Sequence, residues 1–351
     1  MQRRPAGSLT RSILGLCLAV GAVVPGVAHA TADTFALAPD AQVVGQTSTV
    51  AASHDDTLTD IARVHGLGYE EIVWANRKVD IWLPGEGTPV VLPKSFILPG
   101  ETRTGVVVNI AEYRLYHYYK SNGQLMVSTF PISIGRMDWA TPIGRWTVTA
   151  KQKDPNWYPP ESIRQEHLED GRGFLAKVVP AGPDNPLGKY AMRLSASGYL
   201  IHGTNKPVGV GMQVTHGCIR MYPEDIEWLF PQVPVNTPVQ IMNQPYKFGW
   251  SGNDLYLEVH PPLEDDHSTR EREMTALTEQ YVLLTRDRPA RIDWQAVEDA
   301  YRRRDGIPER GMPAGVDVPK PIAQPVETMV REARHHQSCE CPNVQGAGGP
   351  P

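Results

Sequence analysis

The chain has 351 residues and a formal net charge of −5 at pH 7. This mildly acidic balance argues against nucleic acid or an anionic membrane surface as a partner, because both attract basic proteins. Four cysteines in 351 residues are too few for a disulfide-stabilised scaffold, so the fold must depend on a hydrophobic core. A chain of this length has room for one large domain with accessory segments.

Residues 1–30 have the pattern of a secretory signal peptide. They contain three arginines, an apolar run over residues 13–24 and a small-residue cleavage site at Ala28-His29-Ala30. The run is too short to span a bilayer comfortably, and no later stretch is apolar enough to do so. We therefore expect an exported protein with no membrane span once the signal is removed. Cys17 leaves with the signal, and the remaining cysteines are Cys218, Cys339 and Cys341.

Residues 46–98 are expected to form a small α/β module. Thr57 and Asp60 have the spacing of a capping box, which predicts the start of a helix, and Gly66 supplies its stop. A second helical pattern covers residues 69–76, and a strand pattern covers residues 88–93. The order strand, helix, helix, strand resembles a LysM domain, a family that binds the glycan of peptidoglycan. The alternative, a module that packs against the main domain and supports it, stays open.

Residues 99–245 have the sequence pattern of a β domain. Short alternating patterns follow one another with Gly and Pro between them, and Ser121-Asn122-Gly123 has the composition of a hairpin turn. The predicted fold class is a mainly β domain, either a sandwich or a barrel. The clearest strand patterns cover residues 106–110, 114–119, 125–134 and 146–150.

Residues 153–186 are polar, rich in proline and irregular. A loop of this length inside a compact domain is usually either functional or disordered. We expect it to lie over the mouth of the active site as a lid, with Trp157 and Tyr158 as its apolar, substrate-contacting face.

Residues 246–306 are expected to form a C-terminal helical extension. Ser268 and Glu271 have capping-box spacing and start one helical pattern, and residues 293–304 form a second pattern that stops at Gly306. The two helices are predicted to form a hairpin that packs onto the β domain. Residues 307–351 are rich in Pro, Gly and charge, which indicates a disordered tail that contains Cys339 and Cys341.

The chemistry is concentrated in Ile201-His202-Gly203-Thr204 and Val214-Thr215-His216-Gly217-Cys218-Ile219-Arg220. Cys218 becomes a useful nucleophile when a neighbouring base takes its proton, and either His202 or His216 can be that base. Gly217 allows close backbone approach, so N–H groups there can hold an oxyanion. Arg220 shares a strand face with Cys218, since residues two apart point the same way, and is a candidate for binding a substrate carboxylate.

This pattern is similar to the signature of L,D-transpeptidases of the YkuD type. A His-Gly-Thr followed by Thr-His-Gly-Cys-Ile-Arg carries the resemblance, which covers residues 104–242. Two further stretches, Ala140-Thr141-Pro142-Ile143-Gly144 and Asn185-Pro186-Leu187-Gly188, resemble turns common in that domain. The order of LysM-like module, catalytic domain and C-terminal extension resembles the architecture of ErfK-like members.

The resemblance implies a periplasmic enzyme without a cofactor or metal, acting on peptidoglycan stem peptides. Cys218 attacks the carbonyl between the diamino acid and the terminal D-alanine of a tetrapeptide stem, and D-alanine leaves. An amine then resolves the thioester; it comes from another stem or from the lysine of an outer-membrane lipoprotein. His202 matches the base, with the Gly203 carbonyl as its orienting partner. His216 and Gly217 match the oxyanion site, and the expected substrate-binding residues are Thr204, Thr215, Arg220, Trp157 and Tyr158.

Three alternatives remain open. Water in place of the amine makes the same site an L,D-carboxypeptidase. A protein that retains the fold without catalysis is a peptidoglycan-binding protein, although an intact His202 and Cys218 argue against that. A zinc site made by His202, His216 and Cys218 explains the residue types, but it does not explain the glycines or Arg220.

Overall fold

A computed structural model describes residues 32–100, 102–263 and 267–311, with residues 267–274 described by their backbone alone. The expected signal peptide and residues 312–351 of the expected tail, with Cys339 and Cys341, lie outside the described residues. Within the described ranges, none of the helices combines the length and the hydropathy that crossing a bilayer requires.

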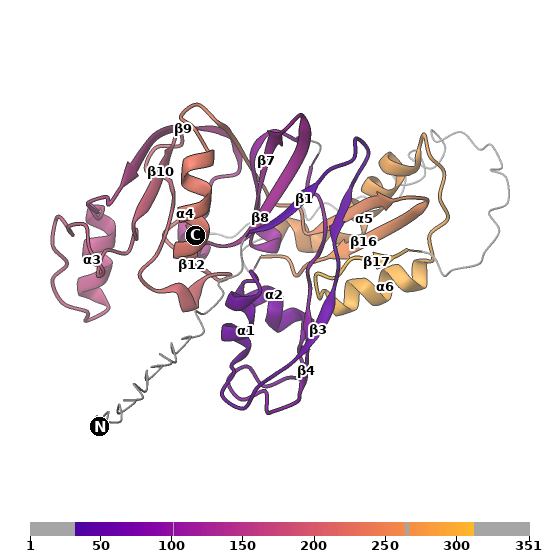
Figure 1. Ribbon diagram of the computed structural model, residues 1–351, viewed down its shortest axis with the longest axis horizontal. Coiled ribbons are helices and arrows are strands. Elements are labelled where there is room, and N and C mark those ends of the chain that lie inside the picture. The colour runs from indigo at the N-terminus through magenta and orange to yellow at the C-terminus, as the bar shows by residue number, and fades with distance from the viewer. Residues whose placement is uncertain (1–31, 101, 264–266, 312–351) are drawn as a thin grey trace, which may run out of the picture.

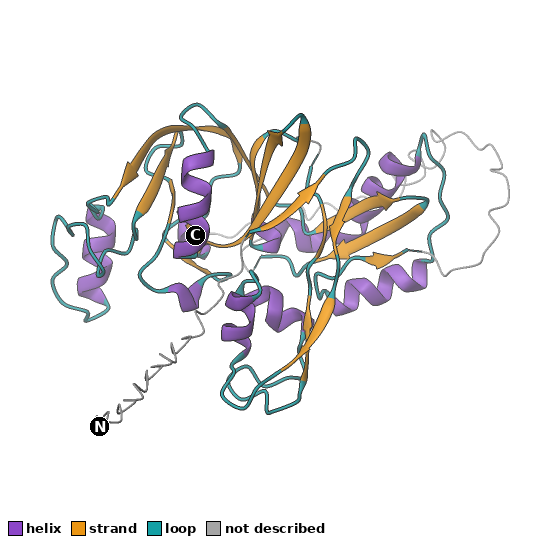
Figure 2. Ribbon diagram, viewed as in Figure 1, coloured by secondary structure: helices purple, strands orange, loops and turns teal. Residues whose placement is uncertain are grey.

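The main body is a ten-stranded sheet that closes on itself (Figures 1 and 2). The strand order β8-β13-β11-β10-β9-β14-β6-β7 returns to its start because β7 also pairs with β8, and β1 and β12 attach to β8 outside this ring. The predicted mainly β domain is therefore confirmed, as a barrel. Its strands are β1 (Asp33–Ala36), β6 (Gly105–Asn109), β7 (Arg114–Ser121), β8 (Gln124–Gly135), β9 (Gly144–Lys153), β10 (Tyr190–Leu194), β11 (Leu200–His202), β12 (Gln213–Thr215), β13 (Ile219–Met221) and β14 (Pro238–Met242).

Two parts of the barrel, β6 and most of β8, are buried on both faces. On β6, Val106 and Val108 belong to the inner core, whereas Val107 belongs to a second apolar cluster with Phe96. Consecutive strand residues point to opposite faces, which explains this division. The predicted hairpin turn between β7 and β8 is confirmed, with positive φ at Asn122 (49°) and Gly123 (80°). The short 3-10 helix η1 (Ile110–Glu112) joins β6 to β7.

Helix α4 (Pro223–Gln232) follows β13 and packs against β10. It begins with proline at its first position, where the missing N–H has no intrahelical partner to lose. Ile226 of α4 lies in the barrel core and approaches Gly203, where an added Cβ would meet its Cγ2 at 3.1 Å. The helix therefore supports the strand end that carries His202.

The N-terminal module has the predicted order of elements. β3 (Ser48–Ala51) is followed by α1 (Leu58–Val64), α2 (Tyr69–Ala75) and β4 (Pro89–Leu92), and β3 pairs with β4 antiparallel. The capping box of Thr57 and Asp60 is present. The module has its own apolar cluster, and β2 (Val43–Gly45) pairs with β5 (Ser95–Ile97) beside it. Its resemblance to LysM stays a prediction.

The C-terminal extension begins with strands that the sequence analysis missed. β15 (Tyr246–Ser251), β16 (Asp254–Val259) and β17 (Glu309–Arg310) form a sheet of their own. Side chains at every second position of β15 and β16 form its apolar face, and α5 (His267–Thr285) and α6 (Trp294–Arg303) pack on it. The predicted helices are confirmed, but they pack on this added sheet. β17 also corrects the expected start of the disordered tail at residue 307.

Buried charges join the three parts. Arg114 of β7 pairs with Glu71 of α2, with 2.6 Å between Arg114 Nε and Glu71 Oε1, and the Arg114 side chain is fully buried. Lys247 of β15 lies 2.7 Å from Glu258 and also pairs with Glu112 of η1. Since unpaired charges are costly in a protein interior, these pairs fix how the module and the extension sit on the barrel.

Candidate active site

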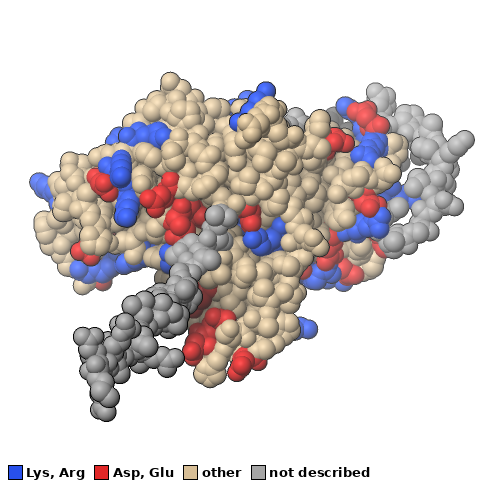
Figure 3. Space-filling model, in the orientation of Figure 1, with Lys and Arg blue, Asp and Glu red and all other residues tan. Residues whose placement is uncertain are grey.

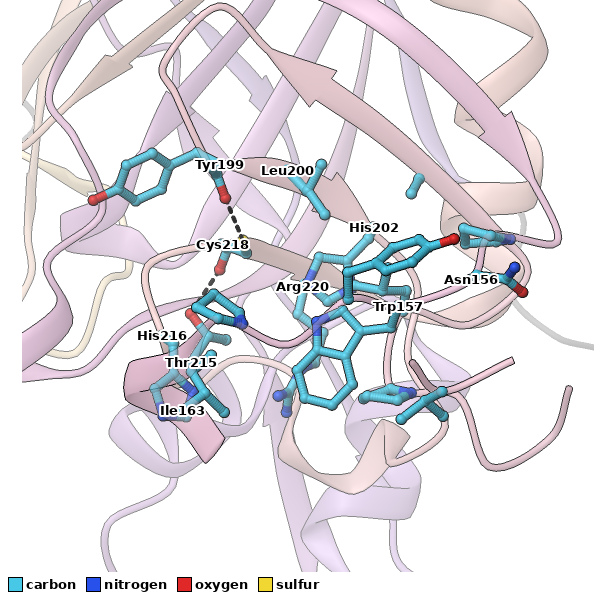
Figure 4. Close-up of a pocket in the computed structure, with 18 of the residues that line it drawn as sticks. Asn156, Trp157, Ile163, Tyr199, Leu200, His202, Thr215, His216, Cys218 and Arg220 are labelled. Atoms are coloured by element: carbon cyan, nitrogen blue, oxygen red, sulfur yellow. Dashed lines mark hydrogen bonds between the residues drawn. The ribbon is translucent and has the colours of Figure 1, made fainter. Parts of the chain in front are cut away.

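A cavity of about 870 Å³ lies between the barrel and residues 153–186 (Figure 4). Strands β10, β11 and β13 form one wall, and the expected lid forms the other. Gly203, Thr204 and Gly217 are not among the lining residues but adjoin them in the chain. The predicted site residues that line the cavity are Cys218, His202, His216, Arg220, Thr215, Trp157 and Tyr158.

Cys218 sits in a tightly held loop between β12 and β13. The Thr215 hydroxyl donates to the Cys218 carbonyl at 2.6 Å, and the buried Thr141 hydroxyl donates to the Gly217 carbonyl at 3.0 Å. Gly217 has φ 93°, and an added Cβ would lie 2.6 Å from the Tyr199 ring. Only glycine fits there. Thr141, which lies in one of the stretches that resemble the family, therefore helps to position Cys218 by holding the backbone of this loop.

The Cys218 thiol is protonated at rest. Its Sγ lies 3.8 Å from the Gly198 carbonyl oxygen, the acceptor of its weak hydrogen bond. Burial raises the pKa of the thiol, and this effect exceeds the opposing effects of the Leu200 backbone and the Arg220 charge. A base must therefore take the proton as the sulfur attacks.

His202 is the last residue of β11 and is placed to be that base. In the parallel pairing of β11 with β13, His202 lies beside Arg220 and Ile201 beside Ile219, so His202, Arg220 and Cys218 share one face. His202 Nδ1 lies 2.6 Å from the Gly203 carbonyl oxygen. Because a carbonyl can only accept, Nδ1 carries the hydrogen and Nε2 is left as the acceptor. Burial and the Arg220 charge lower the pKa of His202 to about 3, so the ring is neutral at pH 7.

His216 is held from the opposite wall. Its Nε2 lies 2.8 Å from Oε2 of Glu166, and its ring contacts Trp139 edge-on with 5.2 Å between centroids. Glu166 belongs to α3 (Glu161–Glu169), so the expected irregular loop contains a helix. The structure describes every residue of α3, and none of them is buried. The helix was missed because such a segment has little apolar periodicity to detect.

The two ends of the 153–186 segment are clamped together. The Asn185 side chain donates to the Pro155 carbonyl at 2.8 Å and to the Pro180 carbonyl at 3.1 Å. Trp157 and Val179 exchange backbone hydrogen bonds at 2.8 and 2.9 Å. Asn185-Pro186, the second stretch that supported the resemblance, therefore positions the lid.

The substrate-binding candidates divide into two groups. Trp157, Tyr158 and Arg220 line the cavity. The buried Arg220 Nε has no hydrogen-bond partner among the residues that the structure describes. Thr204 instead accepts from the Lys206 N–H at 2.9 Å, and the Thr215 hydroxyl is used within the nucleophile loop. Substrate contact by either threonine stays a prediction.

The zinc alternative does not fit this geometry. In the described part of the chain, the three residues with metal-ligand atoms within 4.8 Å of one another are Glu112, Glu258 and His260, not the cysteine and its histidines. Lys247 already pairs with both of those carboxylates.

Comparisons with known proteins identify the family of the chain. The YkuD family, described as the L,D-transpeptidase catalytic domain, matches residues 103–241. The probable L,D-transpeptidase ErfK/SrfK of Salmonella typhimurium is 39% identical over 281 residues, 78% of this chain and 90% of that protein. The probable L,D-transpeptidase YbiS of Escherichia coli K12 is 37% identical over 302 residues, 84% of this chain and 97% of that protein. Among solved structures, the catalytic domain of the E. faecium L,D-transpeptidase is 21% identical to this chain, with a TM-score of 0.30. The match covers 41% of this chain and 100% of that domain.

Proposed function

Because the chain belongs to the L,D-transpeptidase family of enzymes, we propose that Cys218 forms a thioester with a peptidoglycan stem. The donor is a tetrapeptide stem, D-alanine is the leaving group, and an amine of another stem or of a lipoprotein lysine resolves the thioester. The protein acts in the periplasm, to which residues 1–30 direct it. The observation that carries the proposal is that Cys218 and His202 share one face of paired strands in one cavity.

The first half of the reaction uses the tautomer of His202. His202 Nε2 takes the thiol proton while Sγ forms a bond to the scissile carbonyl carbon. N–H groups of the loop at Gly217 and Cys218 are suited to the oxyanion that develops. As the C–N bond breaks, the proton on His202 passes to the amine of the departing D-alanine. The acyl group remains on sulfur as a thioester.

The cavity charge supports an anionic substrate. The charged residues that line the cavity, histidines aside, comprise five bases and Asp184, whereas the whole chain is acidic. Stem peptides carry several carboxylates, and the Arg220 guanidinium, which shares a strand face with Cys218, is suited to bind one. The five bases are Lys151, Arg172, Arg193, Lys206 and Arg220.

The test is mass spectrometry of the purified protein with a tetrapeptide stem. We expect an adduct on Cys218 and release of D-alanine, and we expect Cys218→Ala to abolish both while the thermal unfolding temperature stays within a few degrees. Turnover by Cys218→Ala would refute the cysteine mechanism. A strong chelator should leave activity unchanged. Mainly hydrolysed tripeptide, with a good amine present, would make the protein an L,D-carboxypeptidase.

The division of roles between the histidines is tested on acylation alone. His202→Ala should slow adduct formation by about two to four orders of magnitude, the usual contribution of a general base. His216→Ala should slow this step far less, because the His216 ring is paired with Glu166 on the opposite wall. A larger acylation defect in His216→Ala would reverse the assignment.

A further inference from the structure

One carboxylate of helix α3 binds two residues of the barrel domain. Glu166 binds His216 Nε2 through Oε2 at 2.8 Å, and its Oε1 lies 2.7 Å from Arg136 and 3.6 Å from Arg172. Charged side chains of both signs gather at this end of the molecule (Figure 3). No residue of α3 is fully buried, and Glu166 makes ionic contacts between this helix and the barrel domain.

The contact determines which nitrogen of His216 is free. Burial works to raise the pKa of Glu166, but hydrogen bonds from Arg136 and His216 outweigh it and lower that pKa. An ionised carboxylate can only accept, so His216 Nε2 must donate. The described residues offer His216 Nδ1 no protein hydrogen-bond partner, and the ring lines the cavity.

The two histidines are therefore oriented in opposite senses. His202 gives its Nδ1–H to a carbonyl and keeps Nε2 available, whereas His216 gives its Nε2–H to a carboxylate and keeps Nδ1 available. Figure 4 shows both histidines beside Cys218 in the same cavity. A base fixed by a carboxylate partner is the arrangement that general-base catalysis uses.

We infer that Glu166 is a positioning residue for the second half of the reaction, holding His216 so that Nδ1 takes the proton of the acceptor amine. This inference rests on the proposed function. The neutral amine nitrogen forms a bond to the thioester carbon while its proton passes to Nδ1. The C–S bond breaks, the electron pair leaves with sulfur, and the proton on His216 returns to the thiolate. No other reactant is needed.

The experiment isolates the second step on the mature full-length protein. The thioester on Cys218 is formed with a tetrapeptide stem and freed of excess donor, and its decay is followed by mass spectrometry with a stem-peptide amine. The variant is Glu166→Gln. The control is Glu169→Gln, because Glu169 lies on the same helix and contacts Gln165 rather than the site. A parallel reaction uses hydroxylamine, which is neutral at pH 7 and needs less help from a base.

We expect acylation of both variants within about twofold of the unmodified protein. Transfer to the stem amine should fall at least about tenfold in Glu166→Gln alone, as expected when an oriented general base is lost. Hydroxylamine should restore most of the rate, and Glu166→Asp should recover part of the transfer. Adding His216→Asn to Glu166→Gln should cost little more, since both changes disable one unit.

Equal transfer in Glu166→Gln and Glu169→Gln would overturn the inference. So would an equal loss with hydroxylamine, or an equal loss in acylation, because either result means that Glu166 only maintains the shape of the site. Failure of the unmodified protein to form any adduct on Cys218 is a different result, which would overturn the proposed function and this inference together.

Discussion

Two segments are joined to the barrel by ionic contacts, and the contacts are built differently. The N-terminal module is attached through Arg114 and Glu71, whose side chains are 0% and 7% exposed. Two further backbone hydrogen bonds run from the start of α2 to the carbonyls of Val210 and Gly211. The 153–186 segment is attached through Glu166 and Arg136, whose side chains are 18% and 36% exposed.

The difference indicates which segment can move. Breaking the Arg114–Glu71 pair leaves an unpaired charge in the protein interior, which is costly. Breaking the Glu166–Arg136 pair exposes both charged groups to water, which costs little. The module is therefore the more firmly attached of the two, and α3 is the segment whose ionic contact costs less to open. A segment that covers the thioester excludes water, which favours transfer over hydrolysis.

The largest effect is expected on the free energy of unfolding, when the pair of Arg114 and Glu71 is broken. Arg114→Met should lower the free energy of unfolding by about 3–5 kcal/mol, because Glu71 is left buried without its partner. In the unmodified protein Glu71 raises the pKa of Arg114 despite the burial of the guanidinium, so the arginine stays charged. Urea unfolding measures the change. The double variant Arg114→Met with Glu71→Leu should recover much of the loss, and failure to recover any would mean that the pair does not dominate this junction.

Acid should weaken the barrel before it releases α3. His117, on the same strand as Arg114, is buried, and burial lowers its pKa to about 4. The unfolded chain, with a histidine pKa near 6.5, binds more protons between these values, so stability is complete above pH 6.5 and falls as the pH drops toward 4. The linked loss is about 3 kcal/mol. His117→Phe should flatten the dependence of the unfolding free energy on pH, and an unchanged slope would contradict this cause.

The Glu166 contact depends on pH in a different range. The pKa of Glu166 is lowered from its ordinary value, so its contribution to stability is present above that ordinary value and is lost only as the pH falls through the lowered pKa. Unfolding followed at pH 5 should therefore report on the barrel rather than on the lid.

The features that could be predicted from the sequence are those that local sequence patterns determine. The hairpin turn at Asn122-Gly123 and the capping box at Thr57 were predictable because they involve neighbouring residues. The relation of His202 to Cys218 followed from the family resemblance. The alternation of Tyr246, Phe248 and Trp250 also indicates a strand, but the helical patterns after it led us to assign the whole extension to helix.

The remaining features depend on contacts between distant segments. Glu166 and His216 are 50 residues apart, and Glu71 and Arg114 are 43 residues apart. Charged residues in a sequence usually indicate solvent-exposed positions, so no pattern marks these for pairing. Exposed α3 lacks the apolar stripe that identifies a helix packed on a core.

Removing α3 should change the product ratio while acylation continues. We expect replacement of residues 161–173 by a short Gly-Ser link to raise the ratio of hydrolysed to transferred product about tenfold above that of Glu166→Gln, because water then reaches the thioester in addition to the loss of Glu166. The Asn185 clamp and the pairing of Trp157 with Val179 are kept, so the barrel wall stays intact. Product partitioning at fixed amine concentration is the measurement. A ratio equal to that of Glu166→Gln in a folded variant would mean that α3 does not guard the thioester.

The smallest effect is expected for substitutions of exposed residues on the N-terminal module. Deleting residues 46–98 would leave Arg114 unpaired, so it tests folding rather than glycan binding. Point changes avoid this, because Trp82 and Leu83 are 57% and 78% exposed in a turn held by hydrogen bonds from their N–H groups to Asp80. These two exposed apolar side chains are therefore the positions at which we test the predicted glycan binding.

We expect Trp82→Ala to weaken binding to isolated sacculi by about two- to tenfold, about 0.4–1.4 kcal/mol, while reaction with a soluble stem peptide is unchanged. The free energy of unfolding should change by no more than about 0.5 kcal/mol, as at other surface positions. The matched control is Val64→Ala, at a 44% exposed site on α1 of the same module, which should leave sacculus binding unchanged. Equal binding by both variants would favour the reading in which the module only supports the barrel.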